Sequence, residues 1–196
     1  MTIDPDRYER FPSLLPVKEE VLRHLTAAVK EKDSAFREAS VASQGHDGHP
    51  QVRIMIARDF DSEAMVLTFF TDARSPKVAG LQKDSAVQVL MYDPSIRTQL
   101  RISGEVEIHE DDALADQLWS NLPEYGRGDY LSRQPPGEQI AHPGDSWEDK
   151  TLGSQNFMAF RVHIRAVDWL KLSSQGHRRA LLTWDDGKYS ARWLTP

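Results

Sequence analysis

Alternating apolar and polar positions dominate this chain, and the alternation predicts strands. A period of two places every second side chain on the same face of a strand, whereas short apolar runs between turn residues are typical of strands buried on both faces. None of the apolar runs is long enough for a membrane-spanning helix. Strand-like patterns cover residues 35–43, 51–58, 64–70, 86–92, 97–109, 157–172 and 180–193.

Two segments have the period of a helix instead. Apolar residues recur every three to four positions between Pro16 and Asp33, with charged residues between them, and this predicts an amphipathic helix. A second helix is predicted to begin at Glu110, where three acidic residues favour a helix N-terminus, and to run through Trp119. A shorter helix-like segment follows Pro76.

Many strands, few helices and mostly short connections predict a mainly β (α+β) fold, an antiparallel barrel with peripheral helices. The 196 residues are expected to form a single domain. Residues 1–13 read as an N-terminal arm, and residues 134–156, rich in Pro, Gly, Ser and Asp, read as a long irregular loop. Asp185-Asp186-Gly187 is the expected hairpin turn within the last strand-like segment.

The composition argues against several classes of function. A formal charge of -6 and the lack of a Lys/Arg block argue against binding to nucleic acid. Without cysteine there is no thiol nucleophile, disulfide or zinc-thiolate site, and the pair His46 and His49 makes a poor metal site, so no metal is expected. The first residues lack the basic start and apolar run of a secretion signal, and we expect a cytoplasmic protein without a membrane anchor.

Candidate chemistry is concentrated between Gln51 and Lys77. Arg53 lies in the middle of a strand, and Thr71, Ser75 and Lys77 follow the next strand where a helix begins. A helix start has free backbone N–H groups, and together with two cations and two hydroxyls it favours a phosphate. The alternative explanation is that the two cations are ordinary solvated surface charges.

These residues resemble those of the pyridoxamine 5′-phosphate oxidase-like flavoproteins, in the same order of elements from about Pro16 to the C-terminus. Gly48-His49-Pro50-Gln51-Val52-Arg53 is similar to the family's first FMN motif. Phe70-Thr71-Asp72, followed by Ser75-Pro76-Lys77, is similar to the second, in which the family has Asn and Ser-Arg-Lys. Gln99 before Gly104 is similar to the third, and Ser132-Arg133-Gln134 echoes a Ser-Lys-Gln motif.

The resemblance implies an FMN-binding split barrel that forms a homodimer with FMN at the interface. In that reading Arg53 and Lys77 neutralise the phosphate, hydroxyls add hydrogen bonds, and Gln99 donates to a flavin carbonyl. The cofactor-binding residues that it implies are Arg53, Met55, Phe70, Thr71, Ser75, Lys77, Gln99 and Gln134.

The chain departs from the family in two places. Pro76 replaces an arginine of the second motif, and Arg74 is a possible substitute ligand. The family's substrate-phosphate residues fall on Gln117, Asn121 and Tyr125, and its substrate lysine falls on Arg58. We therefore expect an FMN-dependent oxidoreductase for an unidentified small substrate, whose candidate pocket residues are Arg58, Tyr125, His177 and Arg178. No catalytic residue is assigned.

Two alternatives stay open. The chain could be a flavin-binding or regulatory module without turnover, an idea that Pro76 keeps alive. It could also be a haem-binding split-barrel protein, which its seven histidines permit.

Overall fold

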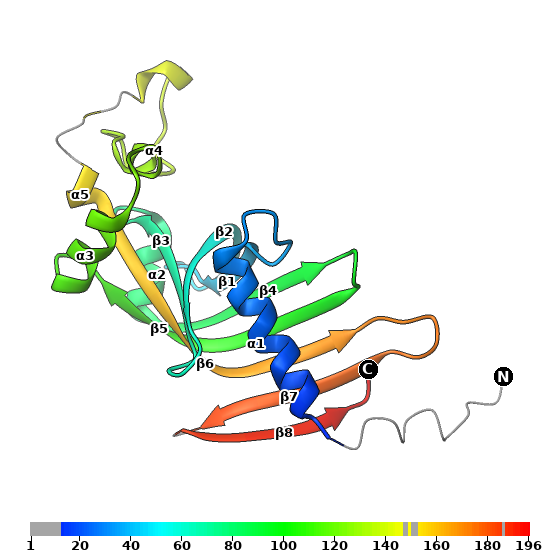
Figure 1. The fold of residues 1–196 in the computed structure, drawn as a ribbon. Coiled ribbons are helices and arrows are strands. Elements are labelled where there is room, and N and C mark those ends of the chain that lie inside the picture. Colours follow the sequence, from blue (N-terminus) through cyan, green and yellow to red (C-terminus); the bar gives the residue numbers. More distant parts are fainter. Residues whose placement is uncertain (1–12, 147–148, 150–152, 186) are drawn as a thin grey trace.

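The computed structural model describes residues 13–146, 149, 153–185 and 187–196. The proposed N-terminal arm, apart from Ser13, and position 186 of the expected hairpin turn lie outside the described residues. Figure 1 shows the elements in chain order: α1 (Leu15–Lys30), β1 (Glu38–Gln44), β2 (Pro50–Asp61), β3 (Val66–Asp72), α2 (Pro76–Lys83), β4 (Ala86–Asp93), β5 (Thr98–His109), α3 (Ala113–Asn121), α4 (Glu124–Arg127), the 3-10 turns η2 (Gly128–Tyr130) and η3 (Pro143–Asp145), α5 (Gly153–Asn156), β6 (Phe157–Lys171), β7 (Arg178–Asp185) and β8 (Lys188–Leu194).

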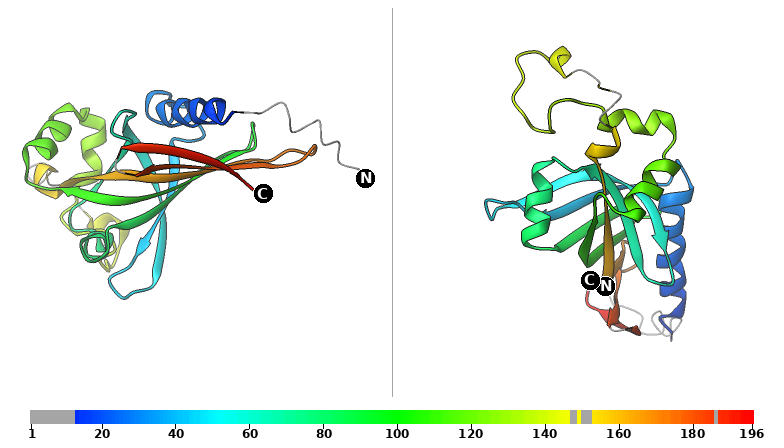
Figure 2. Two further views of the ribbon diagram at one scale, coloured as in Figure 1. Left: turned by 90° about the horizontal axis from the view of Figure 1, so that it is seen from below. Right: turned by 90° about the vertical axis from the view of Figure 1, so that its left-hand side faces the viewer.

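The strands of the described chain form one antiparallel sheet in the order β3-β2-β1-β4-β5-β6-β7-β8. A further pairing between β3 and β6 closes the first six of these strands into a barrel, which removes their open edges. The β7–β8 hairpin continues the sheet beyond the barrel, and the two views of Figure 2 show it as an extension with α1 along one side. The predicted fold class, a mainly antiparallel β-barrel with peripheral helices, is confirmed.

Strand β6 connects the barrel to its extension. It pairs with β3 and β5 inside the barrel and then with β7. Gly104 lies where the β5–β6 register shifts, and a Cβ at this position would overlap the carbonyl oxygen of His163. The close backbone approach expected at this glycine is therefore present, and it allows β5 to bend around the barrel.

The barrel interior holds the main core. Phe69 of β3 and Phe160 of β6 are directly paired across the closing seam, are both fully buried, and stack with ring centroids 5.4 Å apart. The apolar face of α1 covers this core with its buried residues Val17, Val21, Leu25 and Ala28. Burial of that face explains why the helical period is so clear in the sequence.

A second, smaller apolar cluster lies at the barrel end where α3, α4 and α5 gather (Figure 1). Tyr130 and Phe157 are its buried aromatic residues, and Trp119 packs against both. This cluster holds the segment around Tyr130, just before the predicted irregular loop, against the barrel. Among the described residues no helix is long and apolar enough to cross a membrane.

The outer face of the barrel carries apolar side chains that nothing in the described chain covers. Val52 and Ile54 are 71% and 62% exposed, and Leu90 and Tyr92 on β4 are 40% and 41% exposed. They share one face because Ser40 of β1 pairs with both Ile54 and Leu90. A patch of this kind on a strand surface is typical of an interaction site.

Candidate functional site

The Arg53 side chain lies over strand β1. Its Nη1 donates to the Ser43 hydroxyl at 2.8 Å and to the Val41 carbonyl at 3.3 Å, and its Nη2 donates to Gln51 Oε1 at 3.3 Å. Burial lowers the pKa of the Arg53 guanidinium, which nevertheless stays charged at any physiological pH. Polar groups of two adjacent strands thus hold a positive charge at the barrel surface.

Lys77 supplies the second cation from the first turn of α2. Its Nζ donates to Ser75 Oγ at 2.7 Å and to Thr71 Oγ1 at 2.8 Å. Burial lowers the pKa of Lys77, the charge of Arg53 lowers it further, and Asp72 opposes both effects. Neither Arg53 nor Lys77 has a carboxylate within 4.0 Å in the described chain, so a bound anion would relieve their mutual repulsion.

The position of α2 depends on a glycine and a proline. A Cβ at Gly80 would overlap the backbone carbonyl oxygen of Gln44, so only glycine lets α2 pack this closely on the end of β1. Pro76 occupies the first turn, and Ser75 is the N-cap. The first turn contains no acidic residue, and its positive dipole end adds to the charge of Lys77.

Arg53 and Lys77 together line two adjoining hollows. The first has a volume of about 610 Å³ and the second about 280 Å³. The first is also lined by Gln51, Val52, Ile54, Ser75, Pro76, Pro136 and Gly137. The second is also lined by Ile54, Met55, Ile56, Arg58, Phe70, Thr71, Asp72, Asp129, Tyr130 and Pro136. Six of the eight residues implied for the cofactor line these hollows.

Arg58 lies at a bulge in β2, where the β2–β3 register shifts between Ala57 and Asp59. Its side chain lines the smaller hollow. The Arg58 guanidinium lies over the Phe70 ring, 5.6 Å from its centroid. The strand therefore presents a third cation to the smaller hollow.

Tyr130 was not singled out in the sequence, yet its side chain lines the smaller hollow and is 4% exposed. Burial raises the pKa of its hydroxyl to about 12, despite the opposing charge of Arg58. The hydroxyl is thus a permanent hydrogen-bond donor at physiological pH. The available signal was its place just before Ser132-Arg133-Gln134, the stretch that echoes the family's Ser-Lys-Gln motif.

Arg74 is directed away from the two hollows. Its guanidinium pairs with Asp72, with Nη2 to Oδ2 at 2.6 Å and Nε to Oδ1 at 3.0 Å. It also donates to the carbonyl oxygens of Ser132 at 2.9 Å and Arg133 at 3.0 Å. Arg74 therefore does not occupy the place of the arginine that Pro76 replaces.

The two glutamines of the expected cofactor set lie apart from the cations. Gln99 pairs with Tyr92 and Leu170, and these residues lie on the outer face of the barrel. Arg53 instead pairs with Val41, whose side chain lies on the inner face. Gln134 lies between Tyr130 and Pro136, two residues that line the smaller hollow. Its Oε1 is buried without a hydrogen-bond partner in the described chain. An orphaned buried acceptor of this kind suits a donor from a ligand.

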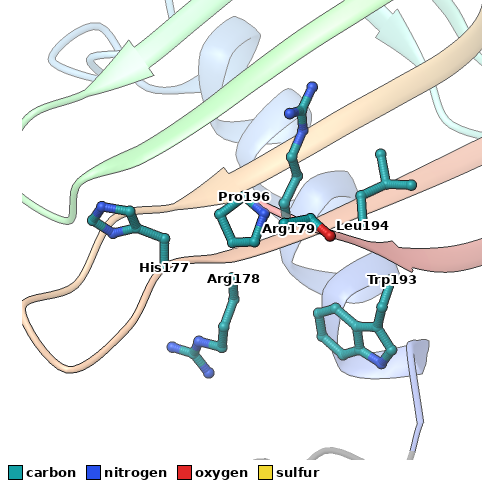
Figure 3. Close-up of a pocket in the computed structure, with 7 residues that line it drawn as sticks. His177, Arg178, Arg179, Trp193, Leu194 and Pro196 are labelled. Carbon is teal, nitrogen blue, oxygen red and sulfur yellow. The ribbon is translucent and has the colours of Figure 1, made fainter. Parts of the chain in front are cut away.

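The other candidate substrate residues do not join Arg58. Tyr125 on α4 is 84% exposed and lines neither hollow. His177 and Arg178 line a separate hollow of about 600 Å³, together with Arg179 and residues 193–196 (Figure 3). His177 Nδ1 there accepts the Ser173 backbone N–H at 3.1 Å, and Arg179 is paired with Asp168.

Known proteins resemble this chain in sequence and in fold. Residues 18–110 match the family model for the pyridoxamine 5′-phosphate oxidase FMN-binding domain. Curated pyridoxine/pyridoxamine 5′-phosphate oxidases from Colwellia psychrerythraea and Myxococcus xanthus are each 26% identical to the chain over 167 residues. These alignments cover 80% of this chain and 76% and 80% of the relatives, respectively.

Two solved structures have the same fold. A pyridoxamine 5′-phosphate oxidase-related, FMN-binding protein from Nostoc punctiforme superposes with a TM-score of 0.76 at 24% identity, over 94% of this chain and all of that chain. PhzG from Burkholderia lata, solved in complex with tetrahydrophenazine-1-carboxylic acid, superposes with a TM-score of 0.70 at 18% identity, over 100% of this chain and 98% of that chain.

The closed barrel has the fold of the pyridoxamine 5′-phosphate oxidase split-barrel proteins. Over residues 18–110 the chain is similar to the FMN-binding domain of that family.

Proposed function

We propose that this protein is an FMN-dependent oxidoreductase that works as a homodimer on a small substrate. The observation that carries the proposal is the convergence of Arg53 and Lys77 on two adjoining hollows without a carboxylate partner in the described chain. Two adjacent, half-buried cations with hydroxyl neighbours suit a dianionic phosphate, the charged end of FMN.

The residues present fit this cofactor. Arg53 and Lys77 hold the phosphate, Ser75 and Thr71 orient the ammonium and add hydroxyls, and Met55 and Phe70 line the adjoining hollow. Gln134 offers an unpaired acceptor nearby. When bound, FMN supplies the transfer of two electrons, for which no protein side chain is suited.

A second copy of the chain completes the proposed site. Gln99 lies on the outer face with the exposed apolar patch, and it cannot reach the hollow beside Arg53 of its own barrel. Pairing two outer faces would bury Val52, Ile54 and Leu90 and bring Gln99 of one protomer toward the flavin of its partner. This geometry supports the proposed homodimer with FMN at its interface.

The proposed substrate differs from that of the curated relatives. Arg58 keeps a positive charge in the smaller hollow, but the positions expected to bind a substrate phosphate are Gln117, Asn121 and Tyr125, which offer no cation. We propose that His177 and Arg178 contribute to substrate binding from the hollow near the C-terminus, which is lined by residues of the β7–β8 hairpin. We propose a small anionic substrate other than pyridoxamine phosphate.

The test is a titration with FMN followed by visible absorption. Arg53→Ala and Lys77→Ala are compared with wild type and with Lys83→Ala, an exposed lysine in the last turn of the same helix. We expect stoichiometric binding that both site variants weaken and the control preserves. Failure of wild type to bind FMN, or a haem Soret band in the purified protein, would overturn the proposal.

A flavin-binding module without turnover is the second candidate, and Pro76 in the wall of the larger hollow favours it, because the family has an arginine there. A substrate screen under air with oxygen consumption as readout separates the two functions. Bound flavin that no small reductant in the panel reduces would support the module.

A further inference from the structure

Residues 129–136 form one wall of the smaller hollow, here called the 129–136 wall. Asp129, Tyr130 and Pro136 are the members that line it. The wall belongs to the segment after α3, not to the barrel, so its position depends on side-chain contacts with the barrel. Phe157 of β6 packs against Tyr130, and in the described chain Asn156 and Arg74 donate hydrogen bonds to the wall.

Asn156 holds the beginning of the wall. Its Nδ2 donates to the Tyr130 carbonyl at 2.7 Å, and its own carbonyl accepts the Ala73 backbone N–H at 2.8 Å. The centre of the wall is held by the adjacent Arg74, whose Nη1 and Nη2 donate to the Arg133 and Ser132 carbonyls. One guanidinium therefore ties the loop after β3, where the phosphate ligands lie, to the segment that closes the hollow.

Arg74 also neutralises Asp72. The Asp72 side chain is 6% exposed and lines the smaller hollow, near Lys77. The bidentate pair with Arg74 raises the pKa of the guanidinium and cancels the negative charge of the carboxylate. Without Arg74, a buried carboxylate would stand uncompensated beside a site for an anion.

We propose that Arg74 is a positioning residue of the flavin site, which fixes the 129–136 wall over the hollow and shields the bound phosphate from Asp72. The shielding role of Arg74 rests on the proposed function, because it needs a bound phosphate. The positioning of the 129–136 wall by Arg74 does not depend on a cofactor.

The planar guanidinium is required for this role. It makes four hydrogen bonds at once, two to a carboxylate and two to carbonyls 58 and 59 residues further along the chain. A lysine ammonium is a point charge that cannot span both partners, so Arg74→Lys is expected to behave like a loss of function and not like a conservative change.

Trypsin provides a readout that is independent of flavin. Arg133 is exposed and lies inside the wall, so release of the wall should speed cleavage after this residue. We expect Arg74→Gln and Arg74→Lys to accelerate that cut, identified by mass spectrometry, relative to wild type. Arg165→Gln removes the same kind of arginine–carboxylate pair from an exposed site and is expected to change nothing.

FMN affinity separates positioning from shielding. Arg74→Gln is expected to weaken FMN binding by on the order of tenfold or more, since it removes hydrogen bonds to a charged group and leaves a carboxylate near the phosphate. The double variant Asp72→Asn/Arg74→Gln should regain part of the affinity, because the negative charge is gone, while its cleavage at Arg133 stays fast. A general loss of folding would not produce this split.

Each result decides the matter. Unchanged cleavage at Arg133 in folded Arg74→Gln and Arg74→Lys, with folding checked by circular dichroism, overturns the positioning role. Equal FMN affinities in the single and double variants overturn the shielding role. If wild type itself does not bind FMN, the proposed function fails, and the cleavage rates alone test whether Arg74 holds the wall.

Discussion

The ammonium of Lys77 lies 2.8 Å from the hydroxyl of Thr71, which links the first turn of α2 to the end of β3. Since Thr71 is 6% exposed, its hydroxyl has little access to water and its main role is to orient this cation. The hydroxyl and the cation therefore act as one unit toward an anion.

Replacing that hydroxyl tests the unit. Thr71→Val is expected to weaken FMN binding by about 1 kcal/mol, the usual contribution of one hydrogen bond. Isothermal titration calorimetry measures the change, and Thr71→Ser, which keeps the hydroxyl, is the matched control. Equal losses in both variants would mean that the methyl group and not the hydroxyl matters.

The affinity of the proposed phosphate site for FMN should change with pH in the alkaline range. The pKa of Lys77 is lowered from 10.5 by burial and by Arg53, so between its lowered pKa and 10.5 the flavin-free protein has lost a proton that the unfolded chain retains. In that window FMN affinity should fall as the pH rises, because the phosphate loses its ammonium partner.

The stability of the flavin-free protein should move in the opposite direction. An unfolded chain that binds more protons than the folded one makes stability increase with pH, so Lys77 contributes a rise in unfolding free energy across the same window. Urea titrations and FMN titrations at several pH values measure both trends. Lys77→Arg, which stays protonated throughout, should flatten them.

The proposed dimer makes a prediction for the outer face. Leu90→Lys places a charge in the exposed apolar patch, outside both hollows, and should convert dimers to monomers in sedimentation experiments, with loss of FMN binding. Ile140→Lys, at a half-exposed position away from the patch, should leave the assembly unchanged. A wild-type protein that sediments as a monomer with flavin bound would contradict the shared site.

The closing seam of the barrel should dominate stability. Phe160→Ala removes a fully buried ring that stacks on Phe69, and such truncations cost about 3–5 kcal/mol. Urea unfolding at fixed protein concentration measures the loss, and Ile140→Ala is the exposed control. A loss below about 1 kcal/mol would indicate that the seam relaxes around the cavity.

The sequence predicts the elements well because burial imposes clear periods. The α1 pattern and the alternation in β5 agree with the structure, as do the start of β6 at Phe157 and the pairing of Asp185 with Lys188 on either side of the expected hairpin turn. Boundaries move by a few residues, as for β1, which begins at Glu38 and not at residue 35. Turn residues set these limits only loosely.

Tertiary relationships could not be read from the chain. Both faces of β2 carry apolar residues, so alternation alone did not reveal that Val52 and Ile54 would be exposed while Met55 is buried. The β-bulge between Ala57 and Asp59 has no signature in the sequence of these residues. The contacts of Arg74 join positions nearly sixty residues apart, and no local pattern encodes such a pairing.

Strand β6, which pairs with β3, β5 and β7, also constrains how the chain can fold. Until residues 157–171 have left the ribosome, β3 and β5 keep open edges, and the ring cannot close. Contacts between strands so distant in sequence form slowly, because a long loop must be ordered first. The nascent chain therefore passes through a stage with two unprotected sheet edges, and it depends on β6 to end its exposure to aggregation.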